Sequence, residues 1–433
     1  MNRKGLGILA AISFCMIFIV NQGWSETTIK LGAIYPLTGP SASTGQLIKQ
    51  GVLLAQDIIN NEYPDIDLEI AKWKGIPSMG NAKIEVAIGD HRGDPALGAD
   101  TAVRLIQDEK VIGLFGCWYS SVTKTVSTVG ERNKIVTLTA SSSSSGLSKR
   151  GYKYFYRAIP HIGIYGRNPF ELLEAMKEGK VKGVSAEETK KLKKVMLVNE
   201  NTEWGKNVND NVVKFAKEYG YELKTLTYSA KSMDLSSEVN RIRAYAPDVL
   251  ILASYVSDAI LFTKTLKEER VAPPVVIGFE GGFTEPGYPN ALGHDSDFVT
   301  IVEYFPLKSL LKSKPFLGKL NEMFKERSGG ENLSTGPVLG FIATQIWATV
   351  LNKAGSTEPE KIIKAFNEIE IPGTQLMMPW RAVKFENFGE DTNQNRRGNN
   401  IMVQFKDKEK NILWPTDLQT EPMVFPFPKW ENR

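Results

Sequence analysis

The sequence contains few of the residues on which most catalytic and metal sites depend. It has only three histidines and two cysteines among 433 residues. His91, His161 and His294 are far apart in the chain, and we expect each to be structural or exposed. The sequence patterns of zinc proteases, serine-hydrolase elbows and phosphate-binding loops do not occur in it. We therefore predict a protein that is not an enzyme and has neither a metal site nor a cofactor.

The sequence also lacks a strong charge and a pair of cysteines for the folded part. Its formal net charge is only +4, which gives no support to a nucleic-acid partner. Cys15 lies in the apolar N-terminal segment, so its removal with that segment would leave Cys117 without a partner. The apolar neighbours of Cys117 predict a buried thiol. Packing, and not a disulfide, must then stabilise the fold.

Only the N-terminus carries a long apolar run. Two basic residues precede apolar residues 6–20, and the small residues Gly23 and Ser25 follow at the spacing of a cleavage site. This is the three-part pattern of a secretory signal peptide. The run is shorter than the roughly 20 residues that a membrane-spanning helix needs. We predict that residues 1–25 are a cleaved signal peptide and that the protein is exported to the periplasm.

Apolar strand-like segments alternate with amphipathic helix-like segments through most of the chain. Uninterrupted apolar strands between helices predict a parallel sheet that is covered on both faces. The pattern restarts at Lys194, so we predict two doubly wound α/β sheets. The predicted strands are residues 29–37, 83–90, 111–118, 135–140, 194–199, 221–228, 249–253, 275–279 and 298–305. The predicted helices are residues 44–62, 94–110, 120–133, 205–219, 236–245, 258–270, 338–353 and 359–368.

The C-terminal part has a different pattern. Residues 382–386, 401–405 and 412–414 are typical of short antiparallel strands. Residues 388–400 are rich in asparagine, glycine and charge, and we predict a loop there.

Polar residues follow four of the predicted strands, where ligands bind in open α/β sheets. The segments are residues 36–45, 116–121 and 141–145, together with Glu280 between glycines. Ser120 or Ser121 is predicted to cap a helix, and a cap with no further role is an equal alternative. The five consecutive serines predict a structured loop that can contact a zwitterion, with a flexible linker as the alternative.

Glu280 is the most informative of these residues. It ends an apolar strand, and a carboxylate there is costly to bury without a cation. The ammonium group of a ligand would supply that cation. The alternatives are a salt bridge to a protein lysine or arginine, or simple exposure.

Several of these motifs occur together, in order, in a known family. The chain resembles the leucine/isoleucine/valine-binding protein family, the solute-binding components of branched-chain amino acid type ABC importers. The resemblance spans nearly the whole chain after residue 25. The segments that carry it are residues 34–40, Asp90 with 94–95, 116–121, 150–152 and 278–281.

The resemblance implies a type I periplasmic-binding-protein fold, in which two α/β lobes are joined by three crossovers and close on a ligand. We expect residues 26–160 and 306–375 to form the first lobe. Residues 161–305 and 376–433 are expected to form the second.

Residues that would hold the two charged ends of an amino acid follow from the resemblance. It implies that Ser120 binds the ligand carboxylate and that Ser141 offers its backbone carbonyl to the ammonium. Ser143 would give a hydroxyl where the family usually has threonine, and Ser142 remains an alternative. Glu280 matches the acidic residue that pairs with the α-ammonium.

Aromatic residues are implied around the rest of the ligand. Trp204 falls where the family often has an aromatic side chain from the second lobe. Tyr255 falls near another, although that alignment can shift by one residue. Trp118 and Tyr119 would face the ligand side chain.

The function implied is capture of an amino acid or related small polar solute for an ABC importer. A membrane permease is the expected partner, and the protein is expected to be monomeric and to bind no nucleic acid. A sensory protein that signals to a membrane receptor is the alternative. The same family also carries aromatic acids, amides and urea, so these remain alternative ligands.

Overall fold

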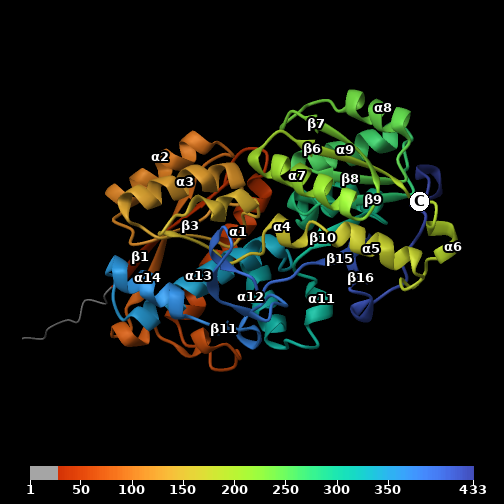
Figure 1. Ribbon diagram of the computed structural model, residues 1–433. Helices are drawn as coiled ribbons and strands as arrows, with labels where there is room; N and C mark the ends of the chain where they lie inside the picture. Colours follow the sequence, from red (N-terminus) through yellow and green to blue (C-terminus); the bar gives the residue numbers. More distant parts are fainter. Residues whose placement is uncertain (1–27) are drawn as a thin grey trace, which may run out of the picture.

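The computed structural model describes residues 28–433, which form two α/β lobes side by side (Figure 1). The predicted signal peptide, residues 1–25, lies outside the described residues. Each lobe contains one seven-stranded sheet. The predicted fold class is therefore confirmed.

The first sheet is parallel except for its last pair of strands. Strand β1, which lies between β2 and β3, has both faces buried from Leu31 onward, as the apolar end of its sequence requires. In spatial order the strands are β2 (Lys83–Asp90), β1 (Thr28–Tyr35), β3 (Leu114–Gly116), β4 (Thr137–Thr139), β5 (Phe155–Arg157), β14 (Asp391–Asn395) and β13 (Phe385–Phe388).

The second sheet repeats this arrangement over its first five strands and differs in the last two. Five parallel strands are followed by two that run antiparallel to their neighbours. In spatial order they are β7 (Glu222–Tyr228), β6 (Lys194–Glu200), β8 (Val249–Ala253), β9 (Val275–Gly278), β10 (Thr300–Glu303), β15 (Ile401–Lys406) and β16 (Glu409–Trp414). A small third sheet pairs β11 (Ile371–Pro372) with β12 (Ala382–Val383).

Helices cover both faces of each sheet (Figure 1). In the first lobe they are α1 (Ala42–Asn60), α12 (Phe316–Ser328), α13 (Thr335–Ala354) and α14 (Pro359–Glu368) on one side, with α2 (Pro95–Gln107) and α3 (Ser120–Asn133) on the other. In the second lobe they are α4 (Ile162–Tyr165), α5 (Asn168–Lys177), α6 (Ala186–Thr189), α7 (Glu203–Glu218), α8 (Ser236–Tyr245), α9 (Val256–Glu268) and α10 (Gly287–Leu292). The short helix α11 (Leu307–Leu310) follows β10.

Successive residues of β6 show why the second sheet is buried on both faces. Val195 and Leu197 pack in one apolar cluster with residues of α5 and α7, whereas Met196 and Val198 pack in another with residues of α8 and α9. Side chains alternate between the two faces of a strand, so an apolar run fits only between two layers of helices.

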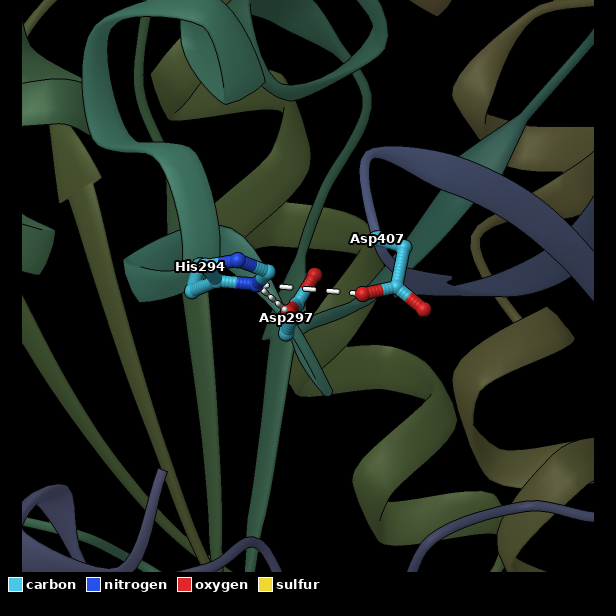
Figure 2. A group of neighbouring side chains, drawn as sticks. All are labelled: His294, Asp297 and Asp407. Atoms are coloured by element: carbon cyan, nitrogen blue, oxygen red, sulfur yellow. Dashed lines mark hydrogen bonds and ion pairs between the residues drawn. The ribbon is translucent and has the colours of Figure 1, made fainter.

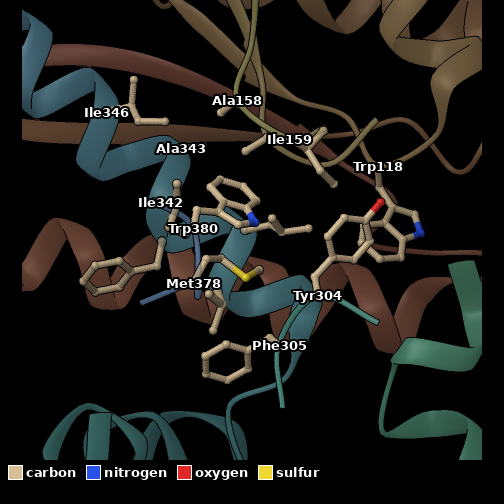
Figure 3. Close-up of a cluster of buried hydrophobic side chains, with 14 of the residues drawn as sticks. Trp118, Ala158, Ile159, Tyr304, Phe305, Ile342, Ala343, Ile346, Met378 and Trp380 are labelled. Atoms are coloured by element: carbon tan, nitrogen blue, oxygen red, sulfur yellow. The ribbon is translucent and has the colours of Figure 1, made fainter. Parts of the chain in front are cut away.

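Three segments cross between the lobes: residues 158–161, 304–306 and 396–400. Figure 3 shows that the first two pack against α13 and against Met378 and Trp380, which follow α14. The labelled side chains are all buried: Trp118, Ala158, Ile159, Tyr304, Phe305, Ile342, Ala343, Ile346, Met378 and Trp380. The first two crossovers therefore lie in a continuous apolar core.

The C-terminal part departs from two predictions. Strands β13 and β14 belong to the first sheet, so the assignment of all of 376–433 to the second lobe is wrong for residues 385–395. Strand β14 also lies within the predicted loop 388–400. Its residues form buried polar contacts in place of apolar ones, as when Ser148 donates to Asp391 at 2.6 Å. Hydrophobic alternation could not reveal such a strand.

Candidate functional site

A small cavity lies between the two lobes. Its volume of about 20 Å³ has room for roughly one water molecule, so the lobes are closed and side chains fill the cleft. The first lobe contributes Trp118, Ser141, Ser143, Thr335 and Leu339, the second Trp204, Tyr255, Glu280, Gly281 and Thr284, and the crossovers Ile159 and Tyr304.

The structure brings together six of the ten predicted site residues on this cavity. They come from both lobes and from five separate stretches of chain: Trp118, Ser141, Ser143, Trp204, Tyr255 and Glu280. The remaining four, Tyr119, Ser120, Ser121 and Ser142, do not line it.

Glu280 is held by three hydrogen-bond donors. One carboxylate oxygen accepts from Ser143 Oγ at 2.5 Å and from Trp204 Nε1 at 2.7 Å, and the other accepts from the hydroxyl of Tyr304. Glu280 follows β9 with a positive φ of 42°, a conformation that non-glycine residues rarely adopt. The side chain is therefore fixed by donors from both lobes and the crossover.

Glu280 has no cationic side chain as a partner within residues 28–433. Among residues 28–433, no lysine or arginine nitrogen lies within 4.0 Å of its carboxylate, and the residue is buried. Burial raises the pKa of Glu280, although hydrogen bonds from Ser143, Tyr304 and Trp204 act in the opposite direction. A salt bridge and simple exposure, the two alternatives considered from the sequence, are thus both wrong. A ligand cation placed here would favour the charged carboxylate.

The serine loop is ordered, and each hydroxyl has a different partner. Ser141 Oγ accepts from the Trp118 backbone N–H at 3.0 Å, and Ser142 Oγ donates to the Trp118 carbonyl at 3.2 Å. Ser142 also shares a hydrogen bond with Thr123. The loop is therefore not a flexible linker, and Ser143 rather than Ser142 reaches Glu280.

Ser120 is buried beside the cavity. Its Oγ accepts from the Ser144 backbone N–H at 3.3 Å. The predicted helix cap is wrong, because α3 begins at Ser120, with Tyr119 in the cap position and no capping side chain. The backbone turns at Trp118, whose φ is 75°, and α3 begins two residues later. Ser120 and Ser121 are therefore the first two residues of the helix and not its cap.

Aromatic rings cross the cleft next to Glu280. The Tyr119 ring of the first lobe lies 4.0 Å, centroid to centroid, from the Tyr255 ring of the second. Trp204 lies 5.0 Å from Tyr255 on the other side. Tyr119 also shares a 2.7 Å hydrogen bond with Ser41. Aromatic rings of the two lobes are therefore in direct contact across the cleft.

Sequence reasoning missed several cavity residues. Tyr304 was placed only inside a predicted strand, and Thr284, Thr335 and Leu339 carried no motif. Tyr304 follows β10, so a polar-tipped aromatic at a strand end was the available signal. The other three lie on a 3₁₀ turn and on α13, and only the tertiary structure brings them to the cleft.

Within residues 28–433, one group of side chains has the spacing of a metal site. It consists of His294, Asp297 and Asp407 (Figure 2). His294 Nδ1 lies 2.9 Å from Asp297 and 3.8 Å from Asp407, and both His294 and Asp407 are largely exposed. The group lies outside the cleft, and the contacts are those of a surface ion-pair cluster.

The other two histidines are buried and have fixed partners. His91 Nε2 lies 2.9 Å from the Cys117 carbonyl, and His161 Nε2 lies 2.9 Å from Asp391. Burial lowers the pKa of both to about 4. Cys117 is buried as predicted, and burial raises the pKa of its thiol to about 12.

Across residues 28–433, every helix is too short or too polar to cross a bilayer.

Comparison with known proteins gives consistent results. The periplasmic binding protein family profile matches residues 28–403. Leu/Ile/Val-binding protein homolog 7 of Brucella suis is 25% identical over 393 residues, which cover 90% of this chain and 92% of the relative. Homolog 8 of Brucella abortus is 25% identical over 404 residues, or 92% of this chain and 93% of the relative.

Solved structures share the fold at lower identity. A leucine-binding protein LivK from Thermotoga maritima superposes with a TM-score of 0.71 at 17% identity, covering 90% of this chain and 99% of that one. LivJ from Streptococcus pneumoniae, solved with isoleucine, superposes with a TM-score of 0.70 at 16% identity. The match covers 89% of this chain and 98% of that one. A Rhodopseudomonas palustris solute-binding protein solved with 4-hydroxybenzoate gives 0.69 at 17% identity over 93% and 99% of the two chains.

Proposed function

Because the chain belongs to the periplasmic binding protein family, we propose that it captures an amino acid between its lobes and delivers it to an ABC importer. The observation that carries the ligand class is Glu280. This carboxylate is buried on the wall of the interlobe cavity with hydrogen-bond donors but no cation within 4.0 Å in residues 28–433. A ligand ammonium would complete it.

The first lobe supplies the groups that suit the other end of a zwitterion. Ser141 lines the cavity, and the buried Ser120 contacts the same serine loop, where its Oγ accepts from the Ser144 backbone N–H. Hydroxyl donors and the N-terminus of α3 favour a carboxylate. The ligand then spans the cleft, with its carboxylate on the first lobe and its ammonium on the second.

An aromatic acid is the second candidate. The cavity is lined by the rings of Trp118, Trp204, Tyr255 and Tyr304, which suit an aromatic ligand. The Rhodopseudomonas protein solved with 4-hydroxybenzoate has the same fold. The phenolic hydroxyl of such a ligand could donate to Glu280 in place of an ammonium. Amides and urea are further ligands that could donate there.

We also propose the cellular setting. Residues 1–25 act as a cleaved signal peptide, the protein works as a monomer in the periplasm, and a membrane permease is its partner. A sensory role with a membrane receptor would use the same closure. Co-purification with a permease, rather than with a receptor, supports transport.

A thermal-shift screen tests the ligand class. Amino acids, hydroxybenzoates, amides and urea are added separately to the purified protein. A true ligand at 100 times its Kd should stabilise the folded state by about 2.7 kcal/mol. Stabilisation by hydroxybenzoates alone would contradict the amino-acid proposal.

Closure gives a second test. Small-angle scattering should show a smaller radius of gyration at saturating ligand, because a ligand that contacts both lobes favours the closed form. An unchanged radius from an open ligand-free protein would contradict capture by closure.

A further inference from the structure

A second cavity of about 40 Å³ lies between the lobes beside the first. Tyr255 lines both cavities, and Tyr119 joins it on the wall of the second. The first lobe contributes Pro40, Gly93, Tyr119 and Ser121, and the second lobe contributes the rest. The cavity therefore lies within the ligand cleft, with the Tyr119–Tyr255 pair on its wall.

Two buried carboxylates, Glu200 and Asp258, line this second cavity. Glu200 ends β6 and is 1% exposed. One of its oxygens accepts from Thr202 Oγ1 at 2.6 Å, and the other is buried with no hydrogen-bond partner. Asp258 is satisfied, because it accepts from the Lys231 backbone N–H at 3.0 Å and from Ser257 at 2.9 Å.

Positive charge around this cavity is limited. Lys231 also lines it, but its side chain is exposed. Among residues 28–433, no lysine, arginine or histidine nitrogen lies within 4.0 Å of either carboxylate. Two buried acids thus face one solvated ammonium. The unpartnered Glu200 oxygen can therefore accept a hydrogen bond from a further donor.

We propose that Glu200 forms a second, acidic subsite of the cleft, and that the ligand is an amino acid whose side chain ends in an ammonium or guanidinium group. This inference rests on the proposed function, with the α-ammonium at Glu280. The rings of Tyr119 and Tyr255 belong to different lobes, so opening of the lobes separates them. The ligand side chain can then lie between Tyr119 and Tyr255 as the lobes close, where aromatic faces favour a nearby cation.

The subsite also predicts a proton signature. Burial raises the pKa of Glu200 to about 8, so its carboxyl is largely protonated at neutral pH in the ligand-free protein. A cation bound there favours the carboxylate and releases a proton. A basic amino acid should therefore release more protons on binding than a neutral one of similar length.

Isothermal titration calorimetry with lysine, arginine and norleucine tests the inference, because norleucine has a similar chain without the terminal charge. We expect lysine or arginine to bind at least tenfold more tightly than norleucine, with a larger buffer-dependent heat. The Glu200→Gln variant should reduce that ratio at least tenfold. If Glu200→Gln folds poorly, Asp258→Asn on the same cavity takes its place. This variant should also lower the affinity ratio.

The matched control is Glu268→Gln, which removes the same charge from an exposed position at the end of α9. It should leave the ratio unchanged. Norleucine binding as tightly as lysine and arginine would overturn this inference alone. A ratio unchanged in folded Glu200→Gln would also overturn it. An absence of binding by every amino acid, with hydroxybenzoate bound, would overturn the proposed ligand class and this inference with it.

Discussion

The two lobes share the order of their first five strands but present different chemistry to the cleft. The strand ends of the first lobe lead into hydroxyls, such as Ser141 and Ser143 after β4. Those of the second lobe end in or lead into carboxylates, namely Glu200 at β6, Glu280 after β9 and Glu303 at β10. The first lobe has an acid at one strand end, Asp90, but Leu37 and Thr38 satisfy it within that lobe.

The carboxylates of the second lobe also differ among themselves. Glu303 forms a buried ion pair with Lys410 and accepts from Thr335, whereas Glu280 and Glu200 have no cation within 4.0 Å in the described part of the chain. A buried carboxylate without a counter-charge is costly, so the group either takes up a proton, as the raised pKa of Glu200 indicates, or pairs with a cation. The difference between the lobes is the reason for proposing that the ligand brings positive charge to the second lobe.

The largest effect on ligand affinity should come from removing the Glu280 carboxylate of the second lobe. Glu280→Gln should cost about 2–5 kcal/mol of amino-acid binding, because it breaks a buried charge pair with the ligand ammonium. Calorimetry measures the affinity, and a melting curve shows that the variant folds. Unchanged affinity for the true ligand would contradict the assigned role.

Two buried groups, His91 of the first lobe and Glu200 of the second, should respond to acid in opposite ways. Burial lowers the pKa of His91 in the first lobe to about 4. As the pH falls, this histidine is therefore protonated in the unfolded protein before it is protonated in the folded protein. Local stability should fall by about 3 kcal/mol between pH 6.5 and 4. Glu200 of the second lobe has a pKa raised to about 8, so its folded state binds the proton first and stability should rise as the pH falls from about 8 to 4.5.

Hydrogen exchange read by mass spectrometry at several pH values checks this contrast. After correction for intrinsic exchange rates, peptides of β2 and α2 should lose protection on acidification, and peptides of β6 and α7 should not. The variant His91→Gln should reduce the loss in the first lobe. Parallel loss in both lobes in the wild type would show that these groups do not dominate.

Removing a hydroxyl from the first lobe should have a smaller effect. Ser143→Ala deletes one donor to Glu280 and should weaken ammonium binding by about 1.5–3 kcal/mol, the range for hydrogen bonds to charged groups. Ser78→Ala, an exposed serine of the same lobe, is the control and should bind normally. Equal affinities of the two variants would mean that Ser143 does not position the carboxylate.

The smallest effect should come from the rim of the cleft. Lys124 of the first lobe pairs with Glu203 of the second at 3.1 Å, but the lysine side chain is half exposed. Lys124→Met should therefore reduce closure by less than about 1 kcal/mol, and raised salt should remove the difference from the wild type. A larger loss that persists at high salt would show that this pair holds the lobes together.

Much of the fold was predictable because it depends on local periodicity. The restart of the pattern at Lys194 predicted the second sheet, and apolar runs such as residues 83–90 and 249–253 matched strands at both ends. Strand β14 was missed because its buried residues are polar, and β5 because only two aromatic residues precede the buried Arg157. Arg157 and Gln394 are paired partners in the sheet and are both fully buried. Hydrophobicity carries no signal for such a pair.

The sequence alone determined the two α/β units, the family resemblance and the presence of an acid at Glu280, because strand alternation and short motifs are local. Tertiary structure decided which groups meet. It placed Tyr304 against Glu280, brought Tyr119 onto Tyr255, left one Glu200 oxygen without a partner and returned β13 and β14 to the first sheet. These contacts join residues far apart in the chain, and their energies depend on burial and direction, which spacing along a sequence does not encode.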